Sequence, residues 1–229
     1  DNTIIQVATL NSLVNGNFDK MEIFSNLPKE LNFGLGTFEN LDGEMILIDS
    51  QLFQLKADGL AYKAEKDIGI PFCTLANFKS EKGIIINDRI EKDDFCKFLD
   101  KEVPYANVPL LIRFDGEFEF IHFRSVPPQK KPYPLLIEVS RKQPEFKKEN
   151  VKGSLIGFRF PNYFSSFNAP GYHFHFISQD RTFGGHSLNF IINKGAINIS
   201  EGKELILKFP NNESFRNANF DIDRSKEVK

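Results

Sequence analysis

The chain has 229 residues, of which 41% are hydrophobic and 26% are charged, as is typical of a globular protein with a substantial core. Its formal net charge of −2 provides no basic surface, so we expect no nucleic-acid partner. No apolar run approaches the roughly 20 residues that a membrane-spanning helix needs, so we expect no membrane partner.

The two cysteines, Cys73 and Cys96, have neither a C-x-x-C spacing nor another metal-ligand spacing. They fit a reducing compartment, and a single disulfide between them is the alternative. No signal peptide is visible, although the sequence starts at Asp1 without an initiator methionine. We therefore expect a cytoplasmic protein, with secretion after removal of an upstream segment as the alternative.

The first hundred residues predict short strands joined by tight turns, with one short and one longer helix. Residues 6–14 have a helical pattern that ends at Asn15-Gly16. Asp-Gly pairs at 42–43 and 58–59 lie between apolar runs and predict two β-hairpins, and residues 71–78 predict a further strand. Residues 90–103 have the 3.6-residue period of a surface helix. The side of this helix that faces the core comprises Ile90, Phe95, Phe98 and Leu99.

A third hairpin is predicted over residues 110–126, with its turn at Asp115-Gly116. The alternation of side chains after this turn puts His122 and Arg124 on the same face as Phe118 and Phe120. Arg124 is therefore expected at the end of a strand, on a largely apolar face.

A proline-rich crossing at residues 127–134 predicts the boundary between two lobes. The N-terminal lobe, residues 1–130, is β-rich and carries Glu44 and Arg124, whereas the C-terminal lobe, residues 131–229, carries three histidines. In the second lobe we expect a helix over residues 135–149, broken at Pro144. Strands are expected over residues 154–160, 172–177, 187–193 and 204–209. The predicted fold class is α+β, with two lobes built on mixed or antiparallel β-sheets and a few flanking helices.

Three of the four histidines, His173, His175 and His186, lie close together in the sequence. His173 and His175 alternate with aromatic residues in a predicted strand, so both imidazoles leave the same face. Residues 178–184 suit a loop that leads into the returning strand. If the two strands pair antiparallel, His186 falls roughly opposite His175, where facing Cβ atoms lie about 4.5–5.5 Å apart.

Three imidazoles on one face of a hairpin predict a metal site. Neutral imidazole suits Zn²⁺ and similar ions, and three protein ligands leave one tetrahedral position open to water or substrate, as in catalytic zinc sites. The alternative is that the H-x-H pair belongs to the polar face of a half-buried sheet. The third histidine, after Gly184-Gly185, favours the metal. For His122 we expect a buried, hydrogen-bonded role, with a fourth metal ligand as the alternative.

The segment GYHFHF, followed seven residues later by GGH, resembles the metal strand pair of alpha-acetolactate decarboxylases. Three further segments resemble that family in the same order: QVATLNSLVNG its N-terminal helix, FGLGTFENLDGE its glycine-rich turn, and FRSVPPQKKPY its arginine segment. The resemblance extends over essentially the whole chain. It implies a two-lobed, usually dimeric zinc enzyme that decarboxylates acetolactate to acetoin and carbon dioxide, with His173, His175 and His186 as zinc ligands.

The same resemblance implies roles for four other residues. Glu44 matches the glutamate that acts as proton donor, Arg124 the arginine that faces the substrate, and Thr37 a threonine near it. The family also brings a glutamate from its C-terminal tail to the site, and Glu227 is the candidate here. Without the resemblance, Glu44 would be an exposed turn carboxylate, Arg124 the partner of a surface acid, and Thr37 a strand-packing residue.

These residue types suit the implied chemistry. A β-keto acid loses carbon dioxide readily once the developing enolate is stabilised, which Zn²⁺ does by chelating the ketone and hydroxyl oxygens. An arginine fork holds an oxygen of the carboxylate or of the enediolate. A carboxylic acid with a raised pKa then delivers a proton to one face of the enediolate.

Two other interpretations stay open. A non-catalytic metal-binding module, of the α+β type conserved in plants and prokaryotes, carries a similar H-x-H and G-G-H arrangement but needs neither Glu44 nor Arg124. A cupin metalloenzyme would place a glutamate shortly after H-x-H, where this chain has Gln179 and Asp180. We therefore place the decarboxylase first, the module second and the cupin third.

Overall fold

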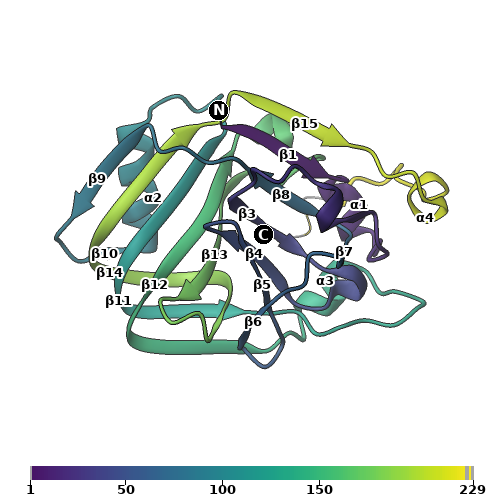
Figure 1. The fold of residues 1–229 in the computed structure, drawn as a ribbon, viewed down its shortest axis with the longest axis horizontal. Coiled ribbons are helices and arrows are strands. Elements are labelled where there is room, and N and C mark those ends of the chain that lie inside the picture. The colour runs from purple at the N-terminus through teal and green to yellow at the C-terminus, as the bar shows by residue number, and fades with distance from the viewer. Residues whose placement is uncertain (1, 225–226, 228–229) are drawn as a thin grey trace.

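Two large β-sheets carry most of the chain, which the computed structural model describes over residues 2–224 and 227 (Figure 1). The first sheet has seven strands in the order β15-β1-β8-β3-β4-β5-β6. Its neighbouring strands pair antiparallel except β1 and β15, which pair parallel. The strands are β1 Thr3–Val7, β3 Phe33–Thr37, β4 Glu44–Ile48, β5 Gln51–Leu55, β6 Ala61–Lys63, β8 Cys73–Ala76 and β15 Glu204–Lys208.

The second sheet is antiparallel and partly closes on itself. Its order is β10-β14-β11-β12-β13, β9 also pairs with β14, and β13 pairs with both β12 and β14. Strands β11, β12, β13 and β14 therefore form a ring. The strands are β9 Lys82–Ile86, β10 Ile90–Glu91, β11 Leu110–Arg124, β12 Glu145–Phe160, β13 Gly171–Ser178 and β14 Gly184–Glu201.

The helices are short and peripheral, apart from α2, which packs against the second sheet. They are α1 Leu10–Val14, α2 Lys92–Glu102, α3 Leu136–Ser140 and α4 Glu213–Arg216, with 3-10 turns η1 Phe24–Asn26, η2 Glu39–Leu41 and η3 Asn162–Phe164. A small two-stranded sheet pairs β2 Glu22–Ile23 with β7 Gly69–Ile70. Over the described residues, no helix combines the length and the apolarity that crossing a membrane requires.

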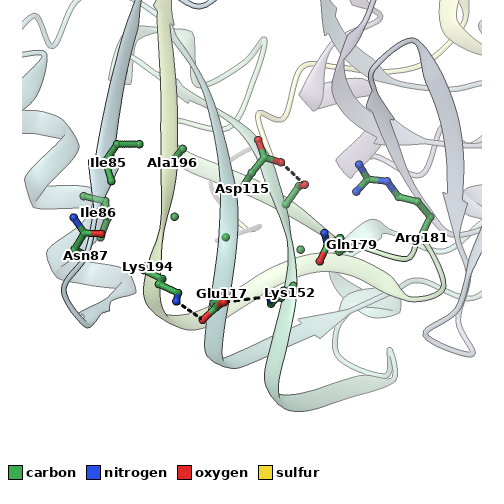
Figure 2. Close-up of a pocket in the computed structure, with 14 residues that line it drawn as sticks. Ile85, Ile86, Asn87, Asp115, Glu117, Lys152, Gln179, Arg181, Lys194 and Ala196 are labelled. Atoms are coloured by element: carbon green, nitrogen blue, oxygen red, sulfur yellow. Dashed lines mark hydrogen bonds and ion pairs between the residues drawn. The ribbon is translucent and has the colours of Figure 1, made fainter.

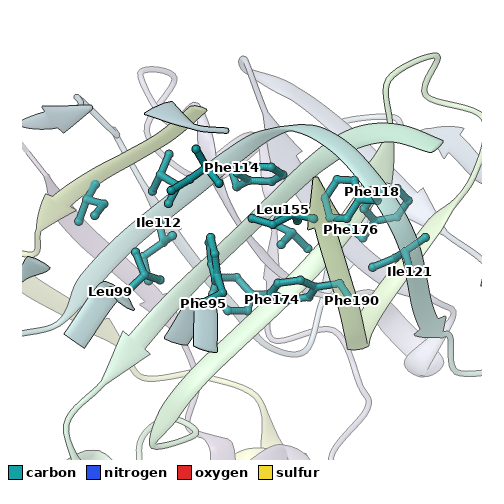
Figure 3. Close-up of a cluster of buried hydrophobic side chains, with 14 of the residues drawn as sticks. Phe95, Leu99, Ile112, Phe114, Phe118, Ile121, Leu155, Phe174, Phe176 and Phe190 are labelled. Atoms are coloured by element: carbon teal, nitrogen blue, oxygen red, sulfur yellow. The ribbon is translucent and has the colours of Figure 1, made fainter. Parts of the chain in front are cut away.

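Both faces of the second sheet contribute side chains to a buried core. One face packs on the first sheet, where Ile156 and Phe158 of β12 join Ile46 of β4 in a shared core. The other face encloses a phenylalanine-rich core, in which Phe95 of α2 meets several rings edge to face (Figure 3). Phe174 lies in this second core, so its neighbours on β13 point the opposite way, toward the first sheet.

Strands β11, β12 and β14 turn at the level of Glu117, Lys152 and Lys194 (Figure 2). Three glycines lie side by side there, because Gly116 pairs with Gly153 of β12 and with Gly195 of β14. A Cβ on Gly116 would collide with the Lys194 carbonyl, so a larger residue is excluded. The turn lets β11 end against the first sheet, where the Ser125 hydroxyl donates to the Leu55 carbonyl.

Part of the predicted secondary structure is confirmed. The first two Asp-Gly turns lie between β3 and β4 and between β5 and β6, and the surface helix is α2, with Phe95 and Leu99 fully buried. Mixed and antiparallel sheets with a few flanking helices are likewise confirmed. The predicted boundary at residues 130 and 131 does not coincide with the division between the sheets, because β11 lies in the second sheet and β15 in the first.

The prediction of a hairpin turn at the third Asp-Gly pair is wrong, because β11 continues through Asp115 and Gly116 as one strand. The predicted division of its faces is also wrong. Pairing with β14 shifts register around Phe118 and again after His122, so the strict alternation is broken. Phe118 therefore lies in the phenylalanine core, whereas His122 points away from it.

Two predicted helices are also wrong in their extent. Residues 3–7 form β1, and α1 begins only after Thr9, whose hydroxyl accepts a hydrogen bond from the Ser12 N–H. After the short helix α3, the chain forms the long strand β12 from Glu145 onward. The neighbouring strand β11 supplies the hydrogen bonds for this segment, so sheet pairing overrides its local helical pattern.

Candidate metal centre

The pairing of β13 with β14 brings three histidines together. His175 and His186 are direct partners across the two strands, as predicted, and His173 lies on the same face of β13. The ligand nitrogens of the three rings all lie within 4.8 Å of one another. Among the described residues, this is a group of the size and composition that can bind one metal ion.

The contact between the two sheets orients the central imidazole. His175 is fully buried, and its Nδ1–H donates to the carbonyl of Met45 on β4, with N and O 2.7 Å apart. This fixes the tautomer, so Nε2 carries the lone pair. Nε2 of His175 is buried and has no hydrogen-bond partner among the described residues, which is costly unless a ligand such as a metal ion occupies its lone pair.

The other two imidazoles also present nitrogens to the same space. Nε2 of His173 and Nδ1 of His186 lie 3.0 Å apart, within hydrogen-bonding distance of each other. Burial lowers the pKa of His173 to about 4 and lowers the pKa of both His175 and His186 well below the ordinary value. All three rings are therefore neutral at physiological pH, the form in which imidazole binds metal ions.

Glu44 lies next to this group, at the start of β4. Its Oε2 atom is 3.6 Å from Nε2 of His175, and only 13% of its side chain is exposed. Burial raises the pKa of Glu44 to about 7, and the positive charge of Arg124 partly offsets that rise. A substantial fraction of this carboxyl group is therefore protonated near neutral pH.

Arg124 is the last residue of β11 and pairs in register with His186 on one side and Glu145 on the other. Burial lowers the pKa of its guanidinium, and the charges of Glu44 and Glu145 oppose that effect. Within the described part of the chain, the guanidinium donates no hydrogen bond to any residue. Its donors are therefore free for an anionic guest.

Thr37 and Glu227 are placed differently from the other predicted residues. Thr37 is buried, pairs with Glu44 in the sheet, and donates from Oγ1 to the Gly43 carbonyl at 2.7 Å. Its hydroxyl thus holds the turn that precedes Glu44. Glu227 forms an ion pair with Arg224 at 3.0 Å, and the described contacts do not join it to the histidines or to Glu44.

His122 is hydrogen-bonded, as we expected, but it is not buried, because 19% of its side chain is exposed. Its Nε2 lies 2.8 Å from the Glu145 carboxylate, and it is not part of the three-histidine group. The carbonyl of Met45 is a functional contact that the sequence did not reveal. Every residue has a carbonyl, so no residue type marks the one that will orient a histidine.

A separate hollow of about 630 Å³ lies at the turn of the second sheet (Figure 2). Its lining includes Glu117, whose carboxylate forms ion pairs with both Lys152 and Lys194. Neither the three histidines nor Glu44 and Arg124 line it. The other charged residues of its lining are also paired, Asp115 with Arg113 and Arg181 with Asp49.

Comparison with known proteins gives a consistent result over nearly the whole chain. The family described as alpha-acetolactate decarboxylase matches residues 4–222. The alpha-acetolactate decarboxylase of Methylococcus capsulatus is 37% identical over 227 residues, which cover 99% of this chain and 86% of that protein. The enzyme of the same name from Bacillus subtilis is 36% identical, covering 99% and 89%. The crystal structure of alpha-acetolactate decarboxylase from Bacillus subtilis strain 168 has a TM-score of 0.95 at 35% identity, covering 99% of this chain and 97% of that one.

Proposed function

Because this chain belongs to the alpha-acetolactate decarboxylase family, and is thus a carboxy-lyase, we propose that it converts 2-acetolactate to acetoin and carbon dioxide in a zinc-dependent reaction. One observation carries this proposal. A neutral three-imidazole group has its His175 nitrogen 3.6 Å from a carboxyl group whose pKa is near 7. It also lies one strand away from an arginine that donates no hydrogen bond to any other described residue.

The three histidines fit Zn²⁺. His173, His175 and His186 would hold it, because their nitrogens converge and the buried Nε2 of His175 lacks another partner. Bound there, Zn²⁺ supplies Lewis-acid stabilisation of the negative charge that develops on the ketone and hydroxyl oxygens of the substrate. The Met45 carbonyl keeps the His175 ring in the orientation that this requires.

The remaining roles fall to side chains of this chain. Arg124 binds a carboxylate or enediolate oxygen through its free donors. When the bond to the carboxylate carbon breaks, its electron pair stays on the substrate as an enediolate, and Glu44 donates a proton to one face of it. Delivery from one side gives acetoin of a single hand.

Thr37 is proposed to position Glu44 rather than to bind substrate, because its hydroxyl is engaged by the Gly43 carbonyl. Glu227 is retained as a second carboxylate of the site, a role that requires the tail to move from its pairing with Arg224. Following the family resemblance, we also propose a homodimer, and we propose a cytoplasmic location because the two cysteines fit a reducing compartment. Light scattering of the purified protein tests the dimer.

The alternative is a non-catalytic metal-binding module, and one experiment separates the two. The zinc content of the purified protein is measured, and the protein is then incubated with racemic 2-acetolactate. We expect about one zinc per chain, release of carbon dioxide, acetoin of one hand, and loss of turnover after chelation. Zinc without acceleration over the spontaneous reaction would favour the module, and full activity without metal would contradict zinc dependence.

A further inference from the structure

Lys92 is the first residue of helix α2 and is partly buried beside the histidine strands. Its ammonium donates a hydrogen bond to the carbonyl of Leu188, with Nζ and O 2.8 Å apart. Leu188 follows His186 by two residues on β14. The start of the helix is thereby tied to the strand that carries one of the three histidines.

The hydrogen bond to Leu188 places this ammonium where the pairing along β14 is interrupted. His175 pairs with His186, so the same antiparallel register, continued by two residues, sets His173 opposite Leu188. The pairing of β13 with β14 stops before that position. On the same side of β14, the next paired residue is Ile191, whose partner is Glu91 of β10. In the gap between these two pairings, Lys92 donates a hydrogen bond to the Leu188 carbonyl, opposite His173.

The charge of Lys92 acts on the histidine group. Burial is the main cause of the low pKa of His173 and His186, and the positive charges of Arg124 and Lys92 lower both further. Lys92 forms no ion pair with any carboxylate among the described residues, so its charge is not neutralised by a direct partner. An ammonium has three N–H donors, and Leu188 uses only one of them.

We propose that Lys92 is a substrate-recruiting residue of this site, which attracts the carboxylate of a small keto acid through its free donors. The role rests on the proposed function, which supplies an anionic substrate. Arg124 can pass from a carboxylate oxygen to an enediolate oxygen, whereas a cation that held only the carboxylate throughout the reaction would oppose its departure as neutral carbon dioxide. A cation at the edge of the site therefore improves capture of the anion and acts on KM rather than on kcat.

The variant Lys92→Gln removes the charge and keeps an N–H donor for Leu188. With the zinc-loaded enzyme at low salt, we expect KM for 2-acetolactate to rise about three- to tenfold, while kcat changes less than about twofold. Added salt should raise the wild-type KM but leave that of the variant nearly constant. Lys92→Arg should restore the wild-type KM. Lys97→Gln is the matched control, since Lys97 lies on the same helix, is 75% exposed and pairs with Asp94.

An uncharged ligand separates recruitment from a purely structural role. Acetoin, the neutral product of the proposed reaction, should bind the wild type and Lys92→Gln equally in a thermal-shift titration, because it has no carboxylate. Weaker acetoin binding, a lower zinc content or an unchanged KM at low salt would each overturn the proposal. An inactive wild-type protein would instead overturn the proposed function, and the role of Lys92 with it.

Discussion

The carboxylate of Glu44 lies 3.6 Å from Nε2 of His175, although the two residues belong to different sheets. The residue after Glu44, Met45, accepts the hydrogen bond from Nδ1 of the same imidazole. Two adjacent residues of β4 therefore contact both nitrogens of one ring. The packing of the sheets sets the distance between the acid and the histidine group, so the acid is positioned by the fold and not by a loop.

Replacement of Glu44 by Gln should remove the proton donor without emptying the metal site. We expect kcat to fall about a hundredfold or more, with the zinc content unchanged, because Glu44 is not one of the three ligands. Glu39→Gln, which alters a carboxylate in the same β3–β4 connection, is the control and should retain activity. An active Glu44→Gln enzyme would reassign the proton donor to another carboxylate, with Glu227 the first to test.

Replacement of Arg124 tests whether its unpaired guanidinium binds the anion. We expect kcat/KM to fall about a hundredfold in Arg124→Lys and further in Arg124→Gln, because lysine keeps the charge but not the two-pronged donor. Arg89→Gln serves as control, since Arg89 is an exposed arginine paired with Glu91 and Glu119. Equal activity of Arg124→Lys and wild type would show that charge alone is required.

The histidine site was predictable because its signal is local. Two histidines at alternate positions of one strand and a third on the returning strand specify a shared face without knowledge of the rest of the fold. The roles of Glu44 and Arg124 were different, because nothing in their own neighbourhood distinguishes them from surface charges. Their proximity to the histidines depends on how the two sheets pack, and only family resemblance indicated it in advance.

The three Asp-Gly pairs show where local reasoning stops. At residues 42–43 and 58–59 the pair lies in the connection between two strands, whereas at residues 115–116 it lies inside β11. The difference is that Gly116 has a glycine beside it on each neighbouring strand. Those partners are distant in the sequence, so a pattern within β11 could not reveal that its glycine serves close packing instead of a turn.

The metal-free protein should lose stability in acid. The folded-state pKa values of the three histidines are depressed, so below about pH 6.5 the unfolded chain binds protons that the folded one does not. Each histidine then lowers the free energy of unfolding by up to about 1.4 kcal/mol per pH unit as pH falls toward 4. Glu44 acts in the opposite direction, because its raised pKa makes the folded state take up a proton between about pH 7 and 4.5.

Urea unfolding at several pH values tests the opposite effects of the histidines and of Glu44 on stability. The unfolding free energy of the metal-free wild type should decrease from pH 7 to pH 5, and that of Glu44→Gln should decrease more steeply because the opposing group is gone. The difference in slope should approach about 1.4 kcal/mol per pH unit. Parallel curves for the two proteins would mean that Glu44 does not titrate with a raised pKa in the metal-free protein.

The turn of the second sheet should also affect the site. On β11 it lies between Gly116 and Arg124, and on β14 it lies between Gly195 and His186. At Gly195, a Cβ would meet the Asp115 carbonyl and approach the Phe114 ring to 2.6 Å. Neither neighbour can retreat, since one is strand backbone and the other lies in the phenylalanine core.

Gly195→Ala should therefore destabilise the protein by about 3 kcal/mol through overpacking. It should also reduce kcat/KM, because strain at the turn displaces the part of β14 that carries His186. Gly83→Ala is the matched control: Gly83 also lies in a strand of this sheet, but its Cβ would meet only Asn198, at 3.7 Å. Urea unfolding should place that variant within about 0.5 kcal/mol of wild type. If both variants were equally stable, the close approach of Gly116, Gly153 and Gly195 would not be required for the turn.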